Sequence, residues 1–335
     1  MLGHAAVSFA VRAYQPGDEE QILALFQHVF GQPRTMAHWR WKFAANPAGR
    51  QISLAVTGDG RIVGQFAGLP ATAVTPDASF VLSQGIDHMV DPEFQQQGVF
   101  AALTRHFAAS HLPPAGDVVF FSYPLAHKHS IDQRITTTEL VHPVRALRFD
   151  LARRERWRAG TGDIWQSWRH RVVRVPRFGA AVEPLWRALR GELGVGIVRD
   201  ARYLNWRYAD CPDVGYTLLQ VESRITGRVV GVAVLRFGWF DEPIAPLLEL
   251  LVPARDQAAL RLLLGACHDL ARERGLSSVK AWIPEATPLH PSLLAHDYAV
   301  EDTPFLLTQI ADTDLRRAAA MRQRWSYSMG DSDIY

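Results

Sequence analysis

The residues best suited to binding or chemistry in this sequence are three glutamines and a glycine. They come just before a segment with the pattern of an amphipathic helix. The run Gln95–Gly98 comes after an apolar segment that ends at Asp91-Pro92. The first N–H groups of a helix lack backbone partners and carry partial positive charge, so a helix start can hold a phosphate. Glycine lets an anion approach the backbone. The pattern therefore predicts either a phosphate cradle or an ordinary strand-to-helix connection in which the glycine relieves a tight turn.

Two elements must position this loop. Before it, residues 79–90 are expected to form a strand. After it, apolar side chains recur at the spacing of one buried helix face, at Val99, Phe100, Leu103 and Phe107. The predicted unit is therefore a strand, a polar loop, a glycine and a helix.

The spacing Gln95-x-x-Gly98 between a strand and a helix resembles the pyrophosphate loop of the GNAT-type N-acyltransferases, whose motif is Gln/Arg-x-x-Gly-x-Gly/Ala. In that family the loop amides bind the pyrophosphate of acetyl-CoA, and the preceding strand hydrogen-bonds the pantetheine arm. The sequence departs from the motif at Phe100, where the family usually has Gly or Ala. The resemblance implies acetyl-CoA as acyl donor. It also implies these cofactor-binding residues: Met89, Val90, Gln95, Gln96, Gln97, Gly98, Val99 and Phe100.

The same resemblance places the chemistry where the fourth and fifth strands of a GNAT fold separate. Acyl transfer to an amine needs a base for the amine, a donor for the oxyanion and an acid for the leaving thiolate. Asp87 or His88 is the expected base, directly or through water. Only one of them can face the cleft, because neighbours on a strand point to opposite sides. The other would be a surface residue or part of a salt bridge.

The remaining roles fall to residues beside the same separation. The backbone N–H of Met89 or Val90 is expected to hold the oxyanion, and Tyr123 or a histidine between 127 and 129 to protonate the thiolate. A structural role for each of these side chains is the alternative. The full set of catalytic candidates is Asp87, His88, Tyr123 and His127, with Ser122, His129 and Ser130 nearby.

Composition limits the class of protein. The 335 residues are enough for two domains, and 48% hydrophobic with 21% charged residues is typical of a soluble globular chain. A formal net charge of +2 favours neither nucleic acid nor an acidic substrate. The two cysteines, Cys211 and Cys267, cannot form a disulfide framework and lack metal-ligand spacing, so we expect a reduced cytoplasm and no metal.

The apolar segments are short. The N-terminus has no basic stretch followed by an apolar run, so a signal peptide is not expected. No apolar run approaches the roughly 20 residues of a membrane span. The predicted protein is therefore cytoplasmic, without an integral membrane segment. Its oligomeric state stays open, with a homodimer among the options.

Residues 1–151 follow the GNAT order of elements, β-α-α-β-β-β-α-β-α-β-β. A first helix is expected to end at Gly31, a second to begin at Thr35, and residues 136–151 to form a terminal pair of strands. The predicted fold is an α/β mixed sheet, with a first GNAT domain over 1–151 that carries the CoA-binding loop.

Residues 152–176 contain seven arginines and three tryptophans. Such a segment could contact a membrane surface, a nucleic acid or an anionic glycan. A linker between domains is favoured, because the basic residues are dispersed.

The second half repeats the first. Trp41–Phe43 and Trp206–Tyr208 are both aromatic–basic–aromatic, and each has a proline six positions after its tryptophan. Further on, Arg61–Gly64 matches Arg228–Gly231. These matches predict an internal duplication, with a second GNAT-like domain over 177–335.

The second copy lacks the glycine loop. Residues 252–260 contain no glycine, and Asp256 is expected to cap the following helix and so occupy the N–H groups that a phosphate would need. The second domain is therefore predicted to be degenerate and to bind no CoA. The whole chain is similar to tandem-GNAT proteins found beside bacterial polysaccharide genes, and its tail, Trp325–Asp333, looks like the tail of that group.

These observations favour an enzyme that transfers an acetyl or other short acyl group from acyl-CoA to the amine of a small molecule or amino sugar. One alternative keeps the fold but takes its acyl group from an aminoacyl-tRNA or an acyl carrier protein, as the Fem-type peptide-bond formers do. Another is a non-catalytic binding protein of a surface-polysaccharide system. Nucleic-acid binding ranks last, because only the segment 152–176 favours it.

Overall fold

The computed structural model describes residues 8–112, 118–126, 138–152, 168–238, 242–310 and 315–334. The chain divides into two compact units. Unit 1 consists of Met1–Thr72, Ser79–Leu140 and Leu306–Asp314, and unit 2 of Ala73–Ala78, Val141–Phe305 and Leu315–Tyr335. Strands β6 (Thr138–Asp150) and β13 (Ala299–Ile310) contribute residues to both. The predicted boundaries at 151 and 177 stay a prediction.

Unit 1 is built on a mixed sheet with the strand order β1-β2-β3-β4-β5-β13. The strands are β1 (Phe9–Ala13), β2 (Gln51–Thr57), β3 (Ile62–Val74), β4 (Ser79–Val90), β5 (Val118–Ser122) and the end of β13. Strands β1, β2 and β3 run antiparallel in sequence, whereas β4 and β5 are parallel. The α/β mixed sheet expected from the sequence is confirmed.

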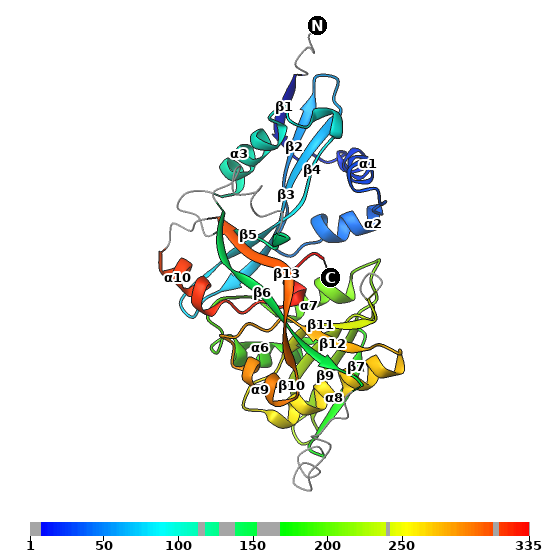
Figure 1. Cartoon of the computed structure of the whole chain (residues 1–335), viewed down its shortest axis with the longest axis vertical. Helices are drawn as coiled ribbons and strands as arrows, with labels where there is room; N and C mark the ends of the chain where they lie inside the picture. The colour runs from blue at the N-terminus through cyan, green and yellow to red at the C-terminus, as the bar shows by residue number, and fades with distance from the viewer. Residues whose placement is uncertain are drawn as a thin grey trace. The chain divides into compact units, whose positions relative to one another are not determined.

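Helices cover both faces of this sheet, with α1 and α2 on one face and α3 on the other (Figure 1). Their bounds are α1 (Glu19–Phe30), α2 (Met36–Trp39) and α3 (Val99–His111). Neighbouring strand residues divide between the two cores: Leu54 packs with the α1 and α2 side chains, and Ala55 packs with those of α3. This alternation is what a sheet buried on both faces requires.

The ends of the first helices match the expectations from sequence. Gly31 follows α1 in the left-handed conformation with φ of 71°, and its N–H donates to the Gln27 carbonyl. The Thr35 hydroxyl accepts a hydrogen bond from the His38 N–H at the start of α2. Both caps are confirmed.

The expected terminal pair of strands over 136–151 is wrong, because the described part forms one continuous strand, β6. Proline has no N–H for the ladder, and Pro143 lies inside this strand. Pro143 lies outside the stretch 147–150, where β6 pairs with β12 (Ser278–Ala281). The short helix expected from Leu125 to Arg134 lies mostly outside the described residues.

Unit 2 has the strand order β13-β6-β12-β11-β10-β9-β7. Its further strands are β7 (His170–Val175), β9 (Thr217–Ser223), β10 (Val229–Leu235) and β11 (Ile244–Leu251), and β8 (Gly196–Ile197) pairs with residues 73–74. Its helices are α6 (Glu183–Leu189), α7 (Ala201–Leu204), α8 (Gln257–Glu273), α9 (Leu289–Ala295) and α10 (Leu315–Arg324). Helix α8 fills the main core with Leu260, Leu263 and Leu264.

The segment 152–176 is only partly described, because residues 153–167 lie outside the described ranges. Its last part is strand β7, which pairs antiparallel with β9 along its whole length. Among the helices of the described ranges, none is long and apolar enough to cross a membrane.

The repeated motif has the same local structure in both units. In unit 1, α2 continues into a π-helical turn over Arg40–Ala44, and in unit 2, α7 continues into one over Asn205–Ala209. The strand glycines also match: a Cβ on Gly64 would lie 2.9 Å from a methyl of Leu103, and one on Gly231 would lie 2.9 Å from a methyl of Leu263. In each unit a glycine therefore lets the long helix approach the sheet closely.

Candidate active site

The site begins where β4 and β5 separate. The two strands pair in parallel from Val81 with Val118 to Gln84 with Phe121, and β5 ends one residue later at Ser122. Strand β4 continues to Val90, so its last residues have a backbone edge that β5 does not cover. This separation provides backbone N–H and C=O groups that an extended ligand could pair with.

Asp87 lies on the uncovered part of β4 in a left-handed conformation, with φ of 49°. Ile86 and Met89 are three residues apart, yet both pack into the core under α1 and α2, which regular alternation would prevent. Asp87 therefore marks a local bulge that changes which face the following side chains take. The Gln65 side chain donates to the Asp87 carbonyl at 3.2 Å and supports the bulge.

Two cations hold the carboxylate of Asp87. Arg34 binds it through both guanidinium nitrogens, and the Lys42 ammonium lies 3.4 Å away. Burial alone would raise the pKa of Asp87, but the charges of Lys42 and Arg34 outweigh it and bring the pKa well below its usual range. Asp87 therefore stays ionised, and Arg34 and Lys42 hold its carboxylate in place.

His88 points to the other side of the sheet. Its ring stacks on Phe66 with centroids 3.8 Å apart and lies near Phe120 and the edge of Phe100. The expectation that Asp87 and His88 face opposite sides is confirmed. Phe100, which departs from the glycine motif, packs here as one wall of the aromatic cluster around His88.

The glutamine loop leaves the start of α3 uncovered. Gly98 is the N-cap residue with φ of 81°, and no side chain caps the helix there. A Cβ on Gly98 would meet nothing within 4 Å, so the space in front of the loop is open. Gln96 is also left-handed, with φ of 60°, and alternating backbone conformations of this kind turn N–H groups toward one point.

The other glutamines bind the loop itself. The Gln95 amide donates to the Val90 carbonyl at 3.4 Å, and the Gln97 amide donates to the Glu93 carbonyl at 2.7 Å. Their side chains thus stabilise the turn through its carbonyls, and neither of them caps the start of α3. The arrangement fits a phosphate group at the start of α3.

The other predicted site residues are distributed around the separation. Met89 is buried in the core, and Val90 packs on the α3 side. Tyr123 is buried just after β5, and the Ser122 hydroxyl lies 2.9 Å from the Thr308 hydroxyl of β13. His127, His129 and Ser130 lie outside the described residues.

Arg34 and Lys42 are site residues that the sequence analysis missed. One signal is visible in the sequence, because Lys42 stands between two aromatic residues of the repeated motif. Its exposure of 3%, which requires an acidic partner, is visible only in the structure. Trp39 is 2% exposed and lies against Tyr14 and Phe43, so its role is in the core.

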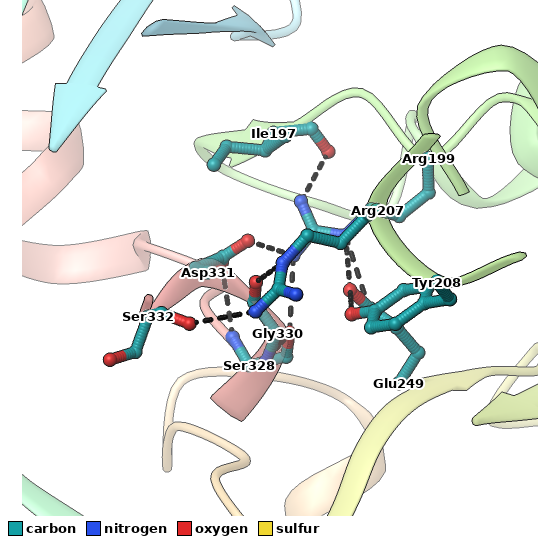
Figure 2. A network of polar contacts seen from close by, with 9 residues as sticks. All are labelled: Ile197, Arg199, Arg207, Tyr208, Glu249, Ser328, Gly330, Asp331 and Ser332. Atoms are coloured by element: carbon teal, nitrogen blue, oxygen red, sulfur yellow. Dashed lines mark hydrogen bonds and ion pairs between the residues drawn. The ribbon is translucent and has the colours of Figure 1, made fainter. Parts of the chain in front are cut away.

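Unit 2 has a counterpart of this charge cluster (Figure 2). Arg199 and Arg207 stand eight residues apart, like Arg34 and Lys42, and Arg199 pairs with Glu249 of β11 at 3.1 Å. The difference is that the tail also enters the cluster: Arg199 binds the Asp331 carboxylate.

The tail also uses its backbone. Arg207 donates to the carbonyls of Gly330 and Ser332, at 3.1 and 2.9 Å.

At the start of α8, the Asp256 carboxylate accepts the Ala259 N–H at 3.0 Å, so the predicted cap is confirmed. Unit 2 therefore has a capped helix start where unit 1 has an open one.

The comparison with protein families finds a match for part of the chain. Residues 10–128 match the model of the acetyltransferase (GNAT) domain. This part of the chain is a GNAT domain. The match contains β4, the glutamine loop and α3 in full. A comparison with curated proteins finds no match.

Solved structures extend the likeness of fold. A conserved protein of Enterococcus faecalis V583, described as a probable N-acyltransferase, is 13% identical with a TM-score of 0.65, and the match covers 91% of this chain and 73% of that one. A GCN5-related N-acetyltransferase of Kribbella flavida is 16% identical with a TM-score of 0.60, and the match covers 90% of this chain and 71% of that one. N-myristoyltransferase of Saccharomyces cerevisiae, solved with bound myristoyl-CoA, is 11% identical with a TM-score of 0.57. That match covers 91% of this chain and 79% of the other. At these identities the likeness concerns the fold, and it extends well beyond the GNAT domain.

Proposed function

We propose that the GNAT domain transfers an acetyl or other short acyl group from acyl-CoA to the amine of a small molecule or amino sugar. The observation that carries this proposal is the uncapped start of α3 behind Gly98, next to the uncovered edge of β4. A helix start with free N–H groups and open space suits a pyrophosphate. A strand edge suits the amide groups of a pantetheine arm.

Acyl-CoA would supply the acyl group in activated form, as a thioester. The chain's residues bind and orient it: the N–H groups of Gly98, Val99 and Phe100 face the phosphates, and the backbone of Met89 and Val90 pairs with the arm. The same backbone N–H groups stabilise negative charge on the acyl oxygen during attack.

Among the candidate bases, His88 is the residue that accepts the proton of the amine. Asp87 is a poor proton acceptor, because Arg34 and Lys42 stabilise its charged form. Asp87 instead positions the bulge. As the new C–N bond forms and the C–S bond breaks, His88 takes the amine proton, and Tyr123 or His127 gives a proton to the thiolate.

Calorimetric titration of acetyl-CoA into the wild type and Gly98→Glu tests the proposal. The carboxylate would fill and repel the phosphate site, so binding should be lost. Gly275→Glu is a matched control, since Gly275 has φ of 68° and equally open surroundings at the end of α8. Binding that survives Gly98→Glu in the folded protein would refute the site. Absence of binding to the wild type would favour a carrier-linked donor or a binding protein without catalysis.

A further inference from the structure

Unit 2 contains a cleft where its own parallel strands separate. Strands β11 and β12 pair from Ile244 with Ser278 to Leu247 with Ala281, and β12 ends there. Strand β11 continues to Leu251 without a partner from β12. The cleft opens at this point, between residues 247–252 and residues 282–284.

The walls of this cleft are apolar. Trp186 and Leu189 of α6 and Trp282 after β12 form buried walls, while Leu193 and Leu251 are partly exposed at the mouth. Burying an apolar chain against such side chains removes apolar surface from water, which favours binding. Ligand sites are commonly clefts with such walls and few polar groups.

One end of the cleft is polar, and its charges are matched. Arg199 and Glu249 line this end together with Tyr327 and Ser328 of the tail. Besides Glu249 and Asp331, Arg199 donates to the Ile197 carbonyl at 2.8 Å and to the Ser328 hydroxyl at 3.3 Å.

The cluster as a whole contains two guanidinium groups and two carboxylates (Figure 2). Burial raises the pKa of Glu249, while Arg199 and the Tyr208 hydroxyl stabilise its charged form. A charged ligand head would be buried beside charges that already have partners, at a large desolvation cost. The polar end therefore favours an uncharged group.

We propose that this cleft is a ligand site of unit 2, which takes an uncharged molecule with an unbranched apolar chain and an amide group. The chain lies along the Trp186, Leu189 and Trp282 walls. The amide pairs with the backbone edge of β11 beyond Leu247, where β12 offers no partner. This inference is independent of the function proposed for the GNAT domain.

Octanamide, octanoate and octylammonium test the site, because they share a chain and differ in head charge. We expect octanamide to bind the wild type with the stoichiometry of one site, and the two charged compounds to bind at least about tenfold more weakly. Calorimetry measures the affinity and the stoichiometry. Gly98→Glu should bind octanamide as the wild type does, which separates this site from the acyl-CoA site.

Ala254→Phe should fill the mouth of the cleft and weaken octanamide at least about tenfold. Ala295→Phe is the matched control, because Ala295 is exposed at the end of α9 and does not line the cleft. Absence of octanamide binding would overturn the proposal, as would binding that Ala254→Phe leaves unchanged. Equal affinity for octanoate would overturn the assignment of an uncharged head.

Discussion

Arg34 binds the carboxylate of Asp87 through both guanidinium nitrogens, across 53 residues of sequence. Asp87 is the residue at which β4 becomes left-handed, and this bulge sets the faces taken by His88 and Met89. A left-handed residue with a side chain persists only when its surroundings determine it. The pair therefore connects the loop before α2 to the geometry of the candidate active site.

Arg34→Gln should destabilise unit 1 by about 3 kcal/mol, because it leaves the buried Asp87 carboxylate with one cation fewer. Amide exchange in β4 measures the loss for this unit separately. Arg171→Gln is the control, since Arg171 pairs with Glu222 at the surface and is 56% exposed. The control should change stability by no more than about 1 kcal/mol. Equal effects of the two substitutions would show that the Asp87 pair is not structural.

The Asp87 pair should also make unit 1 sensitive to acid. The pKa of Asp87 is lower in the folded state than the value of about 3.9 for an unfolded chain. The stabilisation is therefore fully present above pH about 4 and is lost as the pH falls further. Amide exchange in β4 between neutral pH and pH about 3 should show this loss in the wild type and a weaker one in Asp87→Asn. The same pH dependence in both proteins would contradict it.

The sequence predicted the fold and the loop because both depend on local patterns. Helical spacing after Gly98 and caps such as Gly31, Thr35 and Asp256 involve residues close in the chain. The bulge at Asp87 could not be predicted, because it depends on Arg34 and Lys42, which are distant in sequence. Aspartate adopts the left-handed conformation more readily than most residues, but the sequence around Asp87 does not indicate that it does so inside a strand.

The role of the tail was also beyond sequence analysis. Its fit depends on glycines whose partners lie far away: a Cβ on Gly330 would lie 1.8 Å from the Tyr208 hydroxyl, and one on Gly194 would lie 2.2 Å from the Arg324 Cβ. Such close approaches are visible only in three dimensions. The sequence could indicate glycines in the tail region, but not what they approach.

Asp331→Ala should destabilise unit 2 by about 3 kcal/mol, because Arg199 would keep a buried charge with one carboxylate fewer. Amide exchange of residues 325–334 should become faster. Asp302→Ala is the control, since Asp302 pairs with Arg145 at the surface and its side chain is 91% exposed. Unchanged exchange in the tail of Asp331→Ala would mean that Asp331 does not anchor it.

His88→Phe tests the proposed base with little change in packing. Phenylalanine keeps the stack on Phe66 but removes the proton acceptor. Once an amine acceptor is identified, kcat should fall by about 100-fold while affinity for acetyl-CoA, measured by calorimetry, stays the same. His28→Phe is the control, because the His28 side chain is 58% exposed and belongs to α1, on the opposite face of the sheet from the His88 cluster. An unchanged kcat in His88→Phe would assign the base to another residue, and His127 would be the next candidate to replace.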